Sequence, residues 1–596
     1  MSTFPRVWAL VVLALTIVGC GEAPTGGDSA LLKVYRHSMD GSPTNLDPVQ
    51  GSTLYTDFVI KNIYDTLYSY KYLKRPYELK PNLAVAMPEV SPDGLTYTIR
   101  IKQGVEFADS EVFPNGVGRE VTARDFVYSL KRHFDPANRS QGAWLWQGKI
   151  VGLDQWKDAG ASYDAVVSGL RALDDYTIQI QLTTPYPQLV FTLAMQQSAI
   201  VPREAVERYG REFGVNPVGS GPFTLKSFHT QRAVLTRNGN FRQEPVDIYY
   251  EGFDQSVHGP LGLEQLHGRA PPFVDRLEIQ FIEQTAARWN SFTKGTEAQF
   301  TSVPPEQIDV VVAQKQPTVV LNAEFDQQYF HTAELEAGMI YQLFNMDDAS
   351  VGYSDDPVQN ERNKALRCAI RMGFNWPDRI DRFYYGIGQA YPGVIPPVVP
   401  EFDPNMAQES VLYDPDGARQ LLAANGWNTS NLPIIEYGAP SVVTQLQMFE
   451  QFRGWMLNIG YPAEKIKLRS FATFGDFIRA ASERKIMFLG MGWGLDYPDA
   501  QNTLQLFYGP FGAPGSNFAN WVNDEFDALY DETAVMQPSA ERTAMFREMN
   551  QMVVDECVHI GGFSRTRLYL WHRDVVMFPD RGVLGGYFLK YVDVVI

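Results

Sequence analysis

Short alternating segments and capped helices follow one another along the whole chain, and this intermixing constrains the fold most. Residues 95–101 (LTYTIRI), 176–182 (YTIQIQL) and 276–282 (RLEIQFI) alternate apolar and polar side chains with the period of a half-buried strand. No repeat period and no low-complexity tract interrupts the pattern. The sequence therefore predicts a mixed α/β protein.

The helices between these segments carry readable start and stop signals. In TARDFVYSLKRHFDP, Thr122 and Asp125 form a capping-box pattern, and the apolar residues that follow share one helical face. In YDPDGARQLLAANGW, Asp414 is the expected N-cap and Gly426 closes the helix. Both segments are therefore predicted to be amphipathic helices.

The N-terminus predicts export. Arg6 precedes an apolar run over residues 7–15, which is shorter than the roughly 20 residues of a membrane-spanning helix but has the length of a signal-peptide core. The run leads into IVGC, which resembles the lipobox of bacterial lipoprotein signals, in which the cysteine receives a lipid. We expect residues 1–19 to be a lipoprotein signal peptide, Cys20 to be lipidated and residues 20–30 to be a flexible tether. The alternative is an ordinary secretory signal with an incidental cysteine.

Length, charge and cysteine content restrict the number of lobes, the class of ligand and the possible disulfides. The 596-residue chain is too long for one hydrophobic core, so two or more lobes are expected. Its formal net charge of −18 argues against nucleic-acid binding, because phosphate contacts need clustered lysine and arginine. Beyond Cys20 the cysteines are Cys368 and Cys557. An exported compartment permits a disulfide between them, but the sequence leaves the paired and unpaired states equally open.

Seven segments occur in an order that resembles a known family. They are LDPVQGSTLYTDFVIKNIYDTLYSY, PNLAVAMPEVSPDGLTYTIRIKQGVEFAD, VTARDFVYSLKR, VGSGPFTLKSF, FNMDD followed by NKALRCAIRMGFN, YDPDGARQLLAANGW and GWGLDYPDAQN. In this register they resemble the landmarks of the family 5 extracellular solute-binding proteins, the oligopeptide- and dipeptide-binding proteins of ABC importers. The resemblance runs from about Leu46 to the C-terminus.

The resemblance implies a two-lobed α/β clamshell of the periplasmic-binding-protein type, with crossovers between the lobes and an accessory α/β domain. Lobe I is expected to take residues 31–72, 216–300 and 566–596, the accessory domain residues 73–215, and lobe II residues 301–565. The implied function is that of an extracytoplasmic lipoprotein, periplasmic in a Gram-negative host, that acts as a monomer. It would capture a solute between its lobes, with a short peptide as the favoured ligand, and deliver it to the permease subunits of an ABC transporter.

The segment GWGLDYPDAQN places one carboxylate, Asp496, among glycines and aromatic residues. Because a buried charge needs a partner, Asp496 either points to solvent as an ordinary turn residue or meets a cation brought by a ligand. In peptide-binding members of the family that this chain resembles, an aspartate at this position of a W-x-x-D segment receives the α-ammonium group of the ligand. The resemblance therefore implies substrate-binding roles for Asp496, Trp493, Gly494 and Tyr497. Trp493 offers a π face to a cation, and Gly494 allows a close backbone approach.

Further candidate contacts come from three other segments. They are Ser52, Thr53 and Leu54 in GSTLY, Trp144 and Trp146 in WLW, and Asn517 in YGPFGAPGSNFANW. The first segment matches a first-lobe loop that touches the ligand backbone in relatives, the second lies in the part expected to line the cavity, and the third resembles a loop that follows the key aspartate. Tryptophan pairs are more often packed in a core or on a surface than against a ligand. The residue that would take a peptide's carboxylate is not identified.

The chain also departs from the family pattern. Residues 244–275 form a longer connection than is usual, and their acidic and histidine side chains could in principle hold a metal. A polar surface loop is the favoured interpretation because no recognised ligand spacing occurs, so neither metal nor cofactor is expected. These departures leave the ligand class open among peptides, sugars, opines, nickel complexes and haem, which the same family fold is known to carry.

An enzymatic function is disfavoured. The sequence has no H-E-x-x-H zinc motif, no G-x-S-x-G nucleophile elbow and no Walker loop. A lipid-anchored glycoside hydrolase is the rival from another class, because a sequence cannot show two carboxylates that meet across a cleft. A purely structural lipoprotein would not need the clamshell register.

Overall fold

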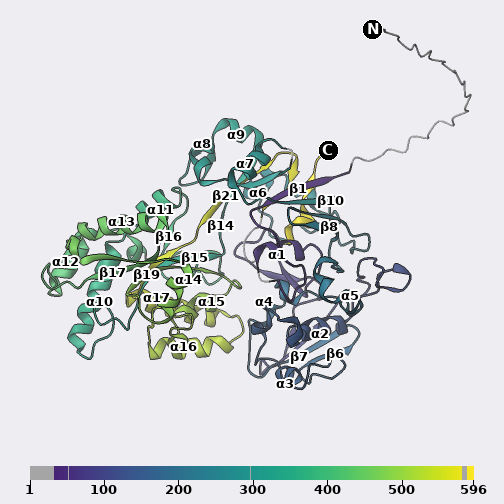
Figure 1. Cartoon of the computed structure of the whole chain (residues 1–596), viewed down its shortest axis with the longest axis horizontal. Coiled ribbons are helices and arrows are strands. Elements are labelled where there is room, and N and C mark those ends of the chain that lie inside the picture. Colours follow the sequence, from purple (N-terminus) through teal and green to yellow (C-terminus); the bar gives the residue numbers. More distant parts are fainter. Residues whose placement is uncertain (1–31, 52, 296, 580–586) are drawn as a thin grey trace, which may run out of the picture.

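The computed structural model describes residues 32–51, 53–295, 297–579 and 587–596. The expected signal peptide, the tether with Cys20, and Ser52 lie outside the described residues. Figure 1 shows two bodies side by side, joined by extended strands, with a group of helices beside the junction. These helices are α7 (Thr285–Thr293), α8 (Ile308–Val311) and α9 (Ala323–Gln328). Within the described ranges, no helix combines the length and apolar character needed to cross a bilayer.

The first body is built on a four-stranded sheet of order β1–β10–β9–β8, in which β1 and β10 are parallel and the other pairs antiparallel. Its strands are β1 (Val34–Met39), β10 (Arg276–Phe281), β9 (Arg232–Arg237) and β8 (Phe223–His229). The strand predicted over residues 276–282 is β10. Two helices accompany this sheet, α1 (Leu54–Ile60) and α6 (Gln255–His258).

An antiparallel accessory sheet of order β4–β5–β7–β6 packs against the first body. Its strands are β4 (Glu89–Val90), β5 (Thr96–Arg100), β7 (Thr177–Gln181) and β6 (Leu170–Asp174), and its helices are α2 (Ala123–Arg132), α3 (Leu153–Asp158), α4 (Leu189–Thr192) and α5 (Arg203–Tyr209). Asp125 accepts a hydrogen bond from the backbone N–H of Thr122 (2.8 Å), as the predicted cap of α2 requires. One hydrophobic core runs through both sheets, so the accessory domain and lobe I share an interior.

The second body surrounds a six-stranded sheet of order β16–β20–β15–β19–β17–β18. Its strands are β16 (Ala390–Tyr391), β20 (His559–Phe563), β15 (Gly338–Phe344), β19 (Phe488–Gly494), β17 (Ile435–Pro440) and β18 (Ile466–Phe471). Alternate residues of β15 enter different cores, because successive strand side chains point to opposite faces. Met339, Tyr341 and Leu343 enter one core, and Phe344 enters the other.

Helices cover both faces of this sheet (Figure 1). They are α10 (Pro357–Met372), α11 (Trp376–Phe383), α12 (Pro415–Ala424), α13 (Val443–Asn458), α14 (Phe474–Ser482), α15 (Gln501–Leu504), α16 (Asp524–Val535) and α17 (Ala540–Asp555). Asp414 caps α12 by accepting the backbone N–H of Gly417 (2.8 Å), as the sequence predicts.

Two short crossovers join the bodies. Glu336 and Ala337 separate β14 (Tyr329–Leu335) from β15, and Ser564 and Arg565 separate β20 from β21 (Thr566–His572). The backbone N–H of Glu336 donates to the carbonyl of Arg565 (2.8 Å), so the two crossovers lie against each other. A motion of one body relative to the other has to bend both segments together.

The pairing of strands crosses the predicted boundary between lobe I and lobe II. The three-stranded sheet of order β11–β21–β14 includes β11 (Phe300–Ser302) and lies outside the six-stranded sheet. Residues 329–335, expected in lobe II, therefore share a sheet with residues 566–572, expected in lobe I. In the part of the chain that the structure describes, three small two-stranded units remain, with the strands β2 (Tyr68–Tyr70), β3 (Leu79–Pro81), β12 (Val312–Gln314), β13 (Val320–Leu321), β22 (Val575–Val576) and β23 (Asp593–Val594). The domain limits as a whole stay a prediction.

The structure resolves the question of the two cysteines. Cys368 on α10 and Cys557, just beyond α17, form a disulfide whose Cα atoms are 5.2 Å apart. The bond joins positions separated by 189 residues, both within the second body. It therefore ties the beginning of this body to its end without touching the crossovers.

The long connection over residues 244–275 packs onto the first body. Glu251 accepts the backbone N–H of Tyr72 (2.8 Å) and forms an ion pair with Lys80. Asp254 caps α6 by accepting the N–H of Ser256 (2.7 Å). These carboxylates thus have structural partners. Among the described residues, no group of three or more histidine, cysteine, aspartate or glutamate side chains is arranged to hold a metal ion.

Candidate functional site

The segment GWGLDYPDAQN begins on β19 and is fixed beside the crossovers. Gly494, the last residue of β19, pairs with Gly338, the first residue of β15. The next N–H, that of Leu495, donates to the carbonyl of Ala337 (3.0 Å). A Cβ atom on Gly338 would lie 2.6 Å from the carbonyl oxygen of Trp493, so this close approach of the strands requires glycine there. After Leu495 the chain leaves the sheet and turns into α15.

Asn502, a buried residue of α15, holds the turn together through its side-chain amide. Its Oδ1 accepts the indole N–H of Trp493 (3.0 Å) and the backbone N–H of Asp496 (3.1 Å). Its Nδ2 donates to Oδ2 of Asp496 (3.0 Å). One amide therefore sets the positions of both the tryptophan and the aspartate that the sequence analysis selected.

Asp496 carries a charge that the described residues do not neutralise. No Lys, Arg or His within the described ranges forms an ion pair with it, and Asn502 supplies a neutral side-chain donor to its carboxylate. Burial raises the pKa of Asp496 above its ordinary value, while the hydrogen bond from Asn502 acts in the opposite direction. A cationic group of a ligand would compensate this carboxylate for the water contacts that it loses on burial.

Asp496 faces a cavity of about 240 Å³, which we call the Asp496 pocket. Second-body, first-body and accessory residues meet there. The lining residues are Thr53, Leu54, Asp57, Lys61, Tyr70, Gln141, Trp144, Ala194, Met195, Gln196, Gln197 and Asp496. Its lysine is already occupied, because Nζ of Lys61 lies 2.9 Å from Oδ2 of Asp57. The formal charge of the pocket is therefore negative.

A larger cavity of about 610 Å³, the Trp493 pocket, adjoins the Asp496 pocket and shares Leu54 with it. It lies mostly on the second body, along β15 and β19. Its lining residues are Leu54, Glu336, Ala337, Gly338, Met339, Ile340, Gln342, Arg379, Phe383, Tyr384, Tyr437, Thr444, Gln445, Met448, Phe474, Gly490, Met491, Gly492, Trp493, Gly494 and Arg565. The two pockets thus lie on either side of Leu54, and the Asp496 carboxylate lines the smaller one.

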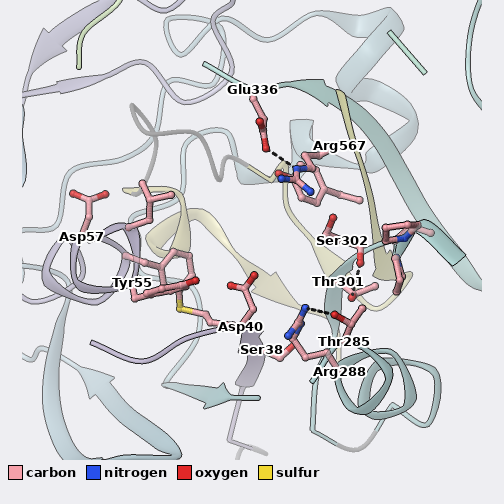
Figure 2. A pocket seen from close by; sticks show the side chains of 17 residues that line it. Ser38, Asp40, Tyr55, Asp57, Thr285, Arg288, Thr301, Ser302, Glu336 and Arg567 are labelled. Carbon is pink, nitrogen blue, oxygen red and sulfur yellow. Dashed lines mark hydrogen bonds and ion pairs between the residues drawn. The ribbon is translucent and has the colours of Figure 1, made fainter. Parts of the chain in front are cut away.

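A third cavity of about 400 Å³, the crossover pocket, opens on the first-body side (Figure 2). It also shares Leu54, and its Glu336 lines the Trp493 pocket as well. Figure 2 shows Arg567 beside Glu336 at one wall and Arg288 beside Thr285 at another. The Nε atoms of Arg567 and Arg565 each lie 2.6 Å from a different oxygen of Glu336, so one carboxylate holds both guanidinium groups.

The structure brings most of the predicted site residues together. Thr53, Leu54, Trp144 and Asp496 line the Asp496 pocket, although they come from distant parts of the chain. Trp493 and Gly494 line the adjoining pocket. Tyr497 is buried behind the turn, where its ring stacks on Phe191 of the accessory domain with centroids 5.7 Å apart. It therefore contacts another domain instead of either pocket.

Two predicted contacts need correction. Trp146 is fully buried, and its indole N–H donates to Oγ1 of Thr192 (3.0 Å), so it belongs to the accessory core. Asn517 is also fully buried, and its Nδ2 donates to the carbonyls of Tyr508 (3.1 Å) and Trp521 (2.9 Å). It shapes its own loop. We remove both residues from the candidate site.

Several lining residues were missed by the sequence analysis. Gln141, Gln196 and Gln197 supply amides to the Asp496 pocket, and Arg379 and Arg565 supply guanidinium groups to the Trp493 pocket. Isolated glutamines and arginines carry no motif spacing. The position of Gln141 three residues before Trp144 is the one signal that could have identified it.

A buried ionic cluster supports the turn from behind. Nη1 of Arg542 lies 2.6 Å from Oδ2 of Asp499, and both side chains are almost fully buried. Glu401 lies beside them and accepts the backbone N–H of Ala500 (3.3 Å). Burial and the nearby carboxylate of Asp499 together raise the pKa of Glu401 to about 7.

This pKa shift predicts a pH-dependent stability. An acid whose pKa is higher in the folded than in the unfolded state stabilises the fold below its unfolded pKa, and that stabilisation is lost as pH rises through about 7. Through this group the wild-type protein should lose about 1–3 kcal/mol of its free energy of unfolding between pH 5.5 and 8. The Glu401→Gln variant should not show that loss. Urea midpoints at several pH values measure this effect. Exposed Glu409→Gln is the control, and a wild-type pH profile retained in Glu401→Gln would contradict the assignment.

Comparison with known proteins identifies the family. The sequence profile of the bacterial extracellular solute-binding proteins, family 5, matches residues 78–515. This chain belongs to that family. It is 24% identical over 562 residues to a dipeptide-binding protein of Escherichia coli (strain K12), covering 92% of this chain and 91% of that one. It is also 24% identical over 570 residues to heme-binding protein A of Haemophilus influenzae, with coverage of 92% and 88%.

A solved structure confirms the family fold. The unliganded open form of a periplasmic murein tripeptide-binding protein matches with a TM-score of 0.73 and 19% identity, over 95% of this chain and 98% of that one. The two-lobed α/β clamshell expected from the sequence is therefore confirmed, and the chain is a solute-binding protein. The Asp496 and Trp493 pockets lie where its two lobes face each other.

Proposed function

We propose that this solute-binding protein captures a short peptide between its lobes and passes it to the permease subunits of an ABC importer. The ammonium group of the peptide would occupy the Asp496 pocket and form a charge-assisted hydrogen bond with the carboxylate of Asp496. Trp493 would cover the adjoining part of the ligand. The protein would act as a monomeric carrier without catalysing a reaction.

One observation carries this proposal: Asp496 is half-buried, is positioned by Asn502, and has no cationic partner among the described residues. A carboxylate in that state favours a cationic ligand group. A dipeptide-binding relative and a murein tripeptide-binding neighbour support a peptide ligand. The haem-binding relative supports the alternative that this fold carries another solute.

The proposal includes the mode of attachment. Cys20 would carry a lipid that anchors the protein to the outer face of a bacterial membrane, with residues 20–30 as the tether. Labelling with a radioactive fatty acid tests this part, and an unlabelled mature protein would contradict it.

A ligand screen tests the proposed function. A peptide bound at about 100 times its Kd should stabilise the protein by about 2.7 kcal/mol, which raises its Tm, and closure of the lobes should reduce the radius of gyration in X-ray scattering. Peptides, sugars and haem should be compared, together with a hydrolysis assay. Binding of peptides without turnover supports the proposal. Binding of sugars or haem alone would reject the peptide, and turnover of a sugar chain would indicate the glycoside hydrolase.

A further inference from the structure

Three arginine side chains converge on one carboxylate on the four-stranded sheet of the first body. Nε of Arg36 lies 3.3 Å from Oε2 of Glu278, and Nη2 of Arg232 lies 2.8 Å from the same oxygen. Nε of Arg276 lies 2.9 Å from Oε1. The side chain of Glu278 is 9% exposed, whereas those of the arginines are 31–41% exposed. Among the described residues these arginines form no other ion pair, so two positive charges stay in excess.

The strand register places this cluster on the side of the sheet that faces away from the core. Arg36 and Glu278 are direct partners in the parallel pair of β1 and β10. Their chain neighbours Tyr35 and Leu277 are buried in the first-body core. Because successive side chains of a strand point to opposite faces, the charged residues lie on the outer face.

The guanidinium groups offer more donors than Glu278 can accept. Each presents several N–H groups in a planar fork, whereas one carboxylate accepts only a few hydrogen bonds. Nε of Arg232 is shielded from solvent and has no acceptor among the described residues. A phosphate group carries several oxygens and matches the planar fork of a guanidinium group. The cluster therefore favours an anion of the phosphate class from outside the protein.

A second carboxylate at the same end of the first body is also outnumbered by basic side chains. Nζ of Lys33 lies 2.6 Å from Oδ1 of Asp593, and Nη2 of Arg269 lies 2.7 Å from Oδ2. Lys33 directly precedes β1, whose first residue, Val34, pairs with Arg276 of the first cluster. Figure 1 shows β1, β10 and the C-terminal end of the chain together at this end. Five basic side chains thus face two carboxylates, on a chain whose formal net charge is −18.

Exposed apolar and aromatic side chains flank the basic ones. Leu32 precedes β1 and is 56% exposed, and Val595 follows β23 and is 54% exposed. Tyr249, also 54% exposed, packs its ring on His267, two residues before Arg269, with centroids 5.0 Å apart. Basic residues interspersed with exposed apolar and tyrosine side chains are typical of surfaces that lie on a membrane.

The proposed lipid tether reaches the protein at this same end. Cys20 is the expected lipidation site and β1 begins at Val34, so the residues between them can span at most about 50 Å. The basic end of the first body would therefore stay near the membrane while the lipid is inserted. A negatively charged leaflet attracts basic residues that come within about a Debye length of it.

We propose that the basic end of the first body is a docking surface for the phosphate groups of anionic membrane phospholipids. Its residues are Lys33, Arg36, Arg232, Arg269 and Arg276. The inference rests on the proposed lipid anchor and is independent of the solute that the protein carries. Bound in this way, the first body would be held at the membrane, and the second body, joined to it by the two crossovers, would move.

Co-sedimentation with lipid vesicles tests the inference. The protein is the mature chain from residue 20 with Cys20→Ser, which keeps every described residue and carries no lipid of its own. The vesicles contain phosphatidylcholine alone, or equal amounts of phosphatidylcholine and phosphatidylglycerol. At about 0.01 M salt the protein should bind the mixed vesicles more tightly. At about 1 M salt this preference should disappear, because the Debye length falls from about 30 Å to about 3 Å.

Single substitutions test whether the named residues form the surface. Arg36→Gln and Arg232→Gln should each weaken binding to the mixed vesicles by about 5-fold, the contribution of one basic residue near an anionic surface. Glu278 keeps two arginines in either variant, so the fold should be retained. Glu278→Gln should strengthen binding by a similar factor, because it removes negative charge from the surface. Arg479→Gln, on the second body, loses the same charge and should bind like the wild type.

The possible outcomes separate the docking surface from its alternatives. Equal binding to both kinds of vesicle, or wild-type binding in both arginine variants, would overturn it. Inorganic phosphate is the second probe. A rise in Tm with phosphate that Arg232→Gln abolishes, without binding to vesicles, would show a site for free phosphate and overturn the membrane assignment. If Glu278→Gln fails to fold, as judged by circular dichroism, the two arginine variants decide the question.

Failure of this inference is distinguishable from failure of the proposed function. Labelling with a fatty acid reports on the anchor alone, and the ligand screen reports on the solute alone. A protein that is labelled and binds peptides, but whose mature chain ignores anionic vesicles, would overturn the docking surface and leave the proposed function standing. A protein that binds these vesicles but is never labelled would remove the anchor and retain the surface.

Discussion

Replacing Asp496 with alanine is expected to weaken the binding of a short peptide by about 30-fold to several thousand-fold. The estimate is the cost of about 2–5 kcal/mol for removing one partner of a buried, hydrogen-bonded charge pair. The loss of affinity should be large because Asn502 already holds the Asp496 carboxylate in place. Ligand binding therefore does not have to immobilise this side chain, and little of the interaction energy is spent on ordering it. Isothermal titration with the best peptide from the screen measures the change.

Three comparisons give this prediction its specificity. Asp496→Asn keeps the shape but loses the charge, and should therefore also bind poorly. N-acetylation of the peptide should reproduce the loss from the ligand side, and combining it with Asp496→Ala should add little. The exposed Asp416, which pairs with Arg419 on α12, is the control, and its alanine variant should change binding by less than about 0.5 kcal/mol. Wild-type affinity in Asp496→Ala would remove the assignment.

Replacing Arg542 with alanine is expected to destabilise the second lobe by about 3–5 kcal/mol. The change would leave Asp499 buried without its ion-pair partner and beside Glu401, whose pKa its charge already raises. It would also remove the hydrogen bond that Nε of Arg542 donates to the carbonyl of Thr533 (2.9 Å). Urea unfolding followed by tryptophan fluorescence measures the shift in midpoint, which suits a protein of several domains better than one extrapolated free energy.

The matched control is Arg479→Ala. Arg479 pairs with Asp476 on the surface of the same lobe, with its side chain 66% exposed, and its loss should change the midpoint little. The double variant Asp499→Ala/Arg542→Ala should be less destabilised than the sum of the two single variants, because no unpaired charge remains. An Arg542→Ala protein as stable as the wild type would show that the pair contributes nothing.

Sequence reasoning predicted the local elements well where one physical cause decided them. The alternation over residues 95–101 and 176–182 became β5 and β7, since a half-buried strand needs that pattern and little else. The caps at Thr122 and Asp414 were confirmed because the capping side chain and its partner are neighbours in the chain. The lobed architecture came from the order of the landmarks and not from any single one of them.

The site was predictable only in part, because a cleft is assembled from distant residues. Trp144 and Trp146 look alike in the sequence, yet Trp144 is 53% exposed at the Asp496 pocket and Trp146 is fully buried. The short helical turn that carries them points the two rings in different directions. Arg379 and Arg565 have no motif that joins them. Their common pocket depends on the way the second crossover returns past the end of β19.

The order of the strands also has a consequence for how the protein is made. β21 is the central strand of the three-stranded sheet, yet it follows β14 only after the whole second lobe has been synthesised. At ordinary rates of synthesis, this delay is on the order of tens of seconds. A chain that emerges from its N-terminus thus presents β11 and β14 as exposed edges for that interval, and such edges invite pairing with other chains. Chaperones or the export machinery would have to cover the edges of β11 and β14 until β21 is available to pair with them.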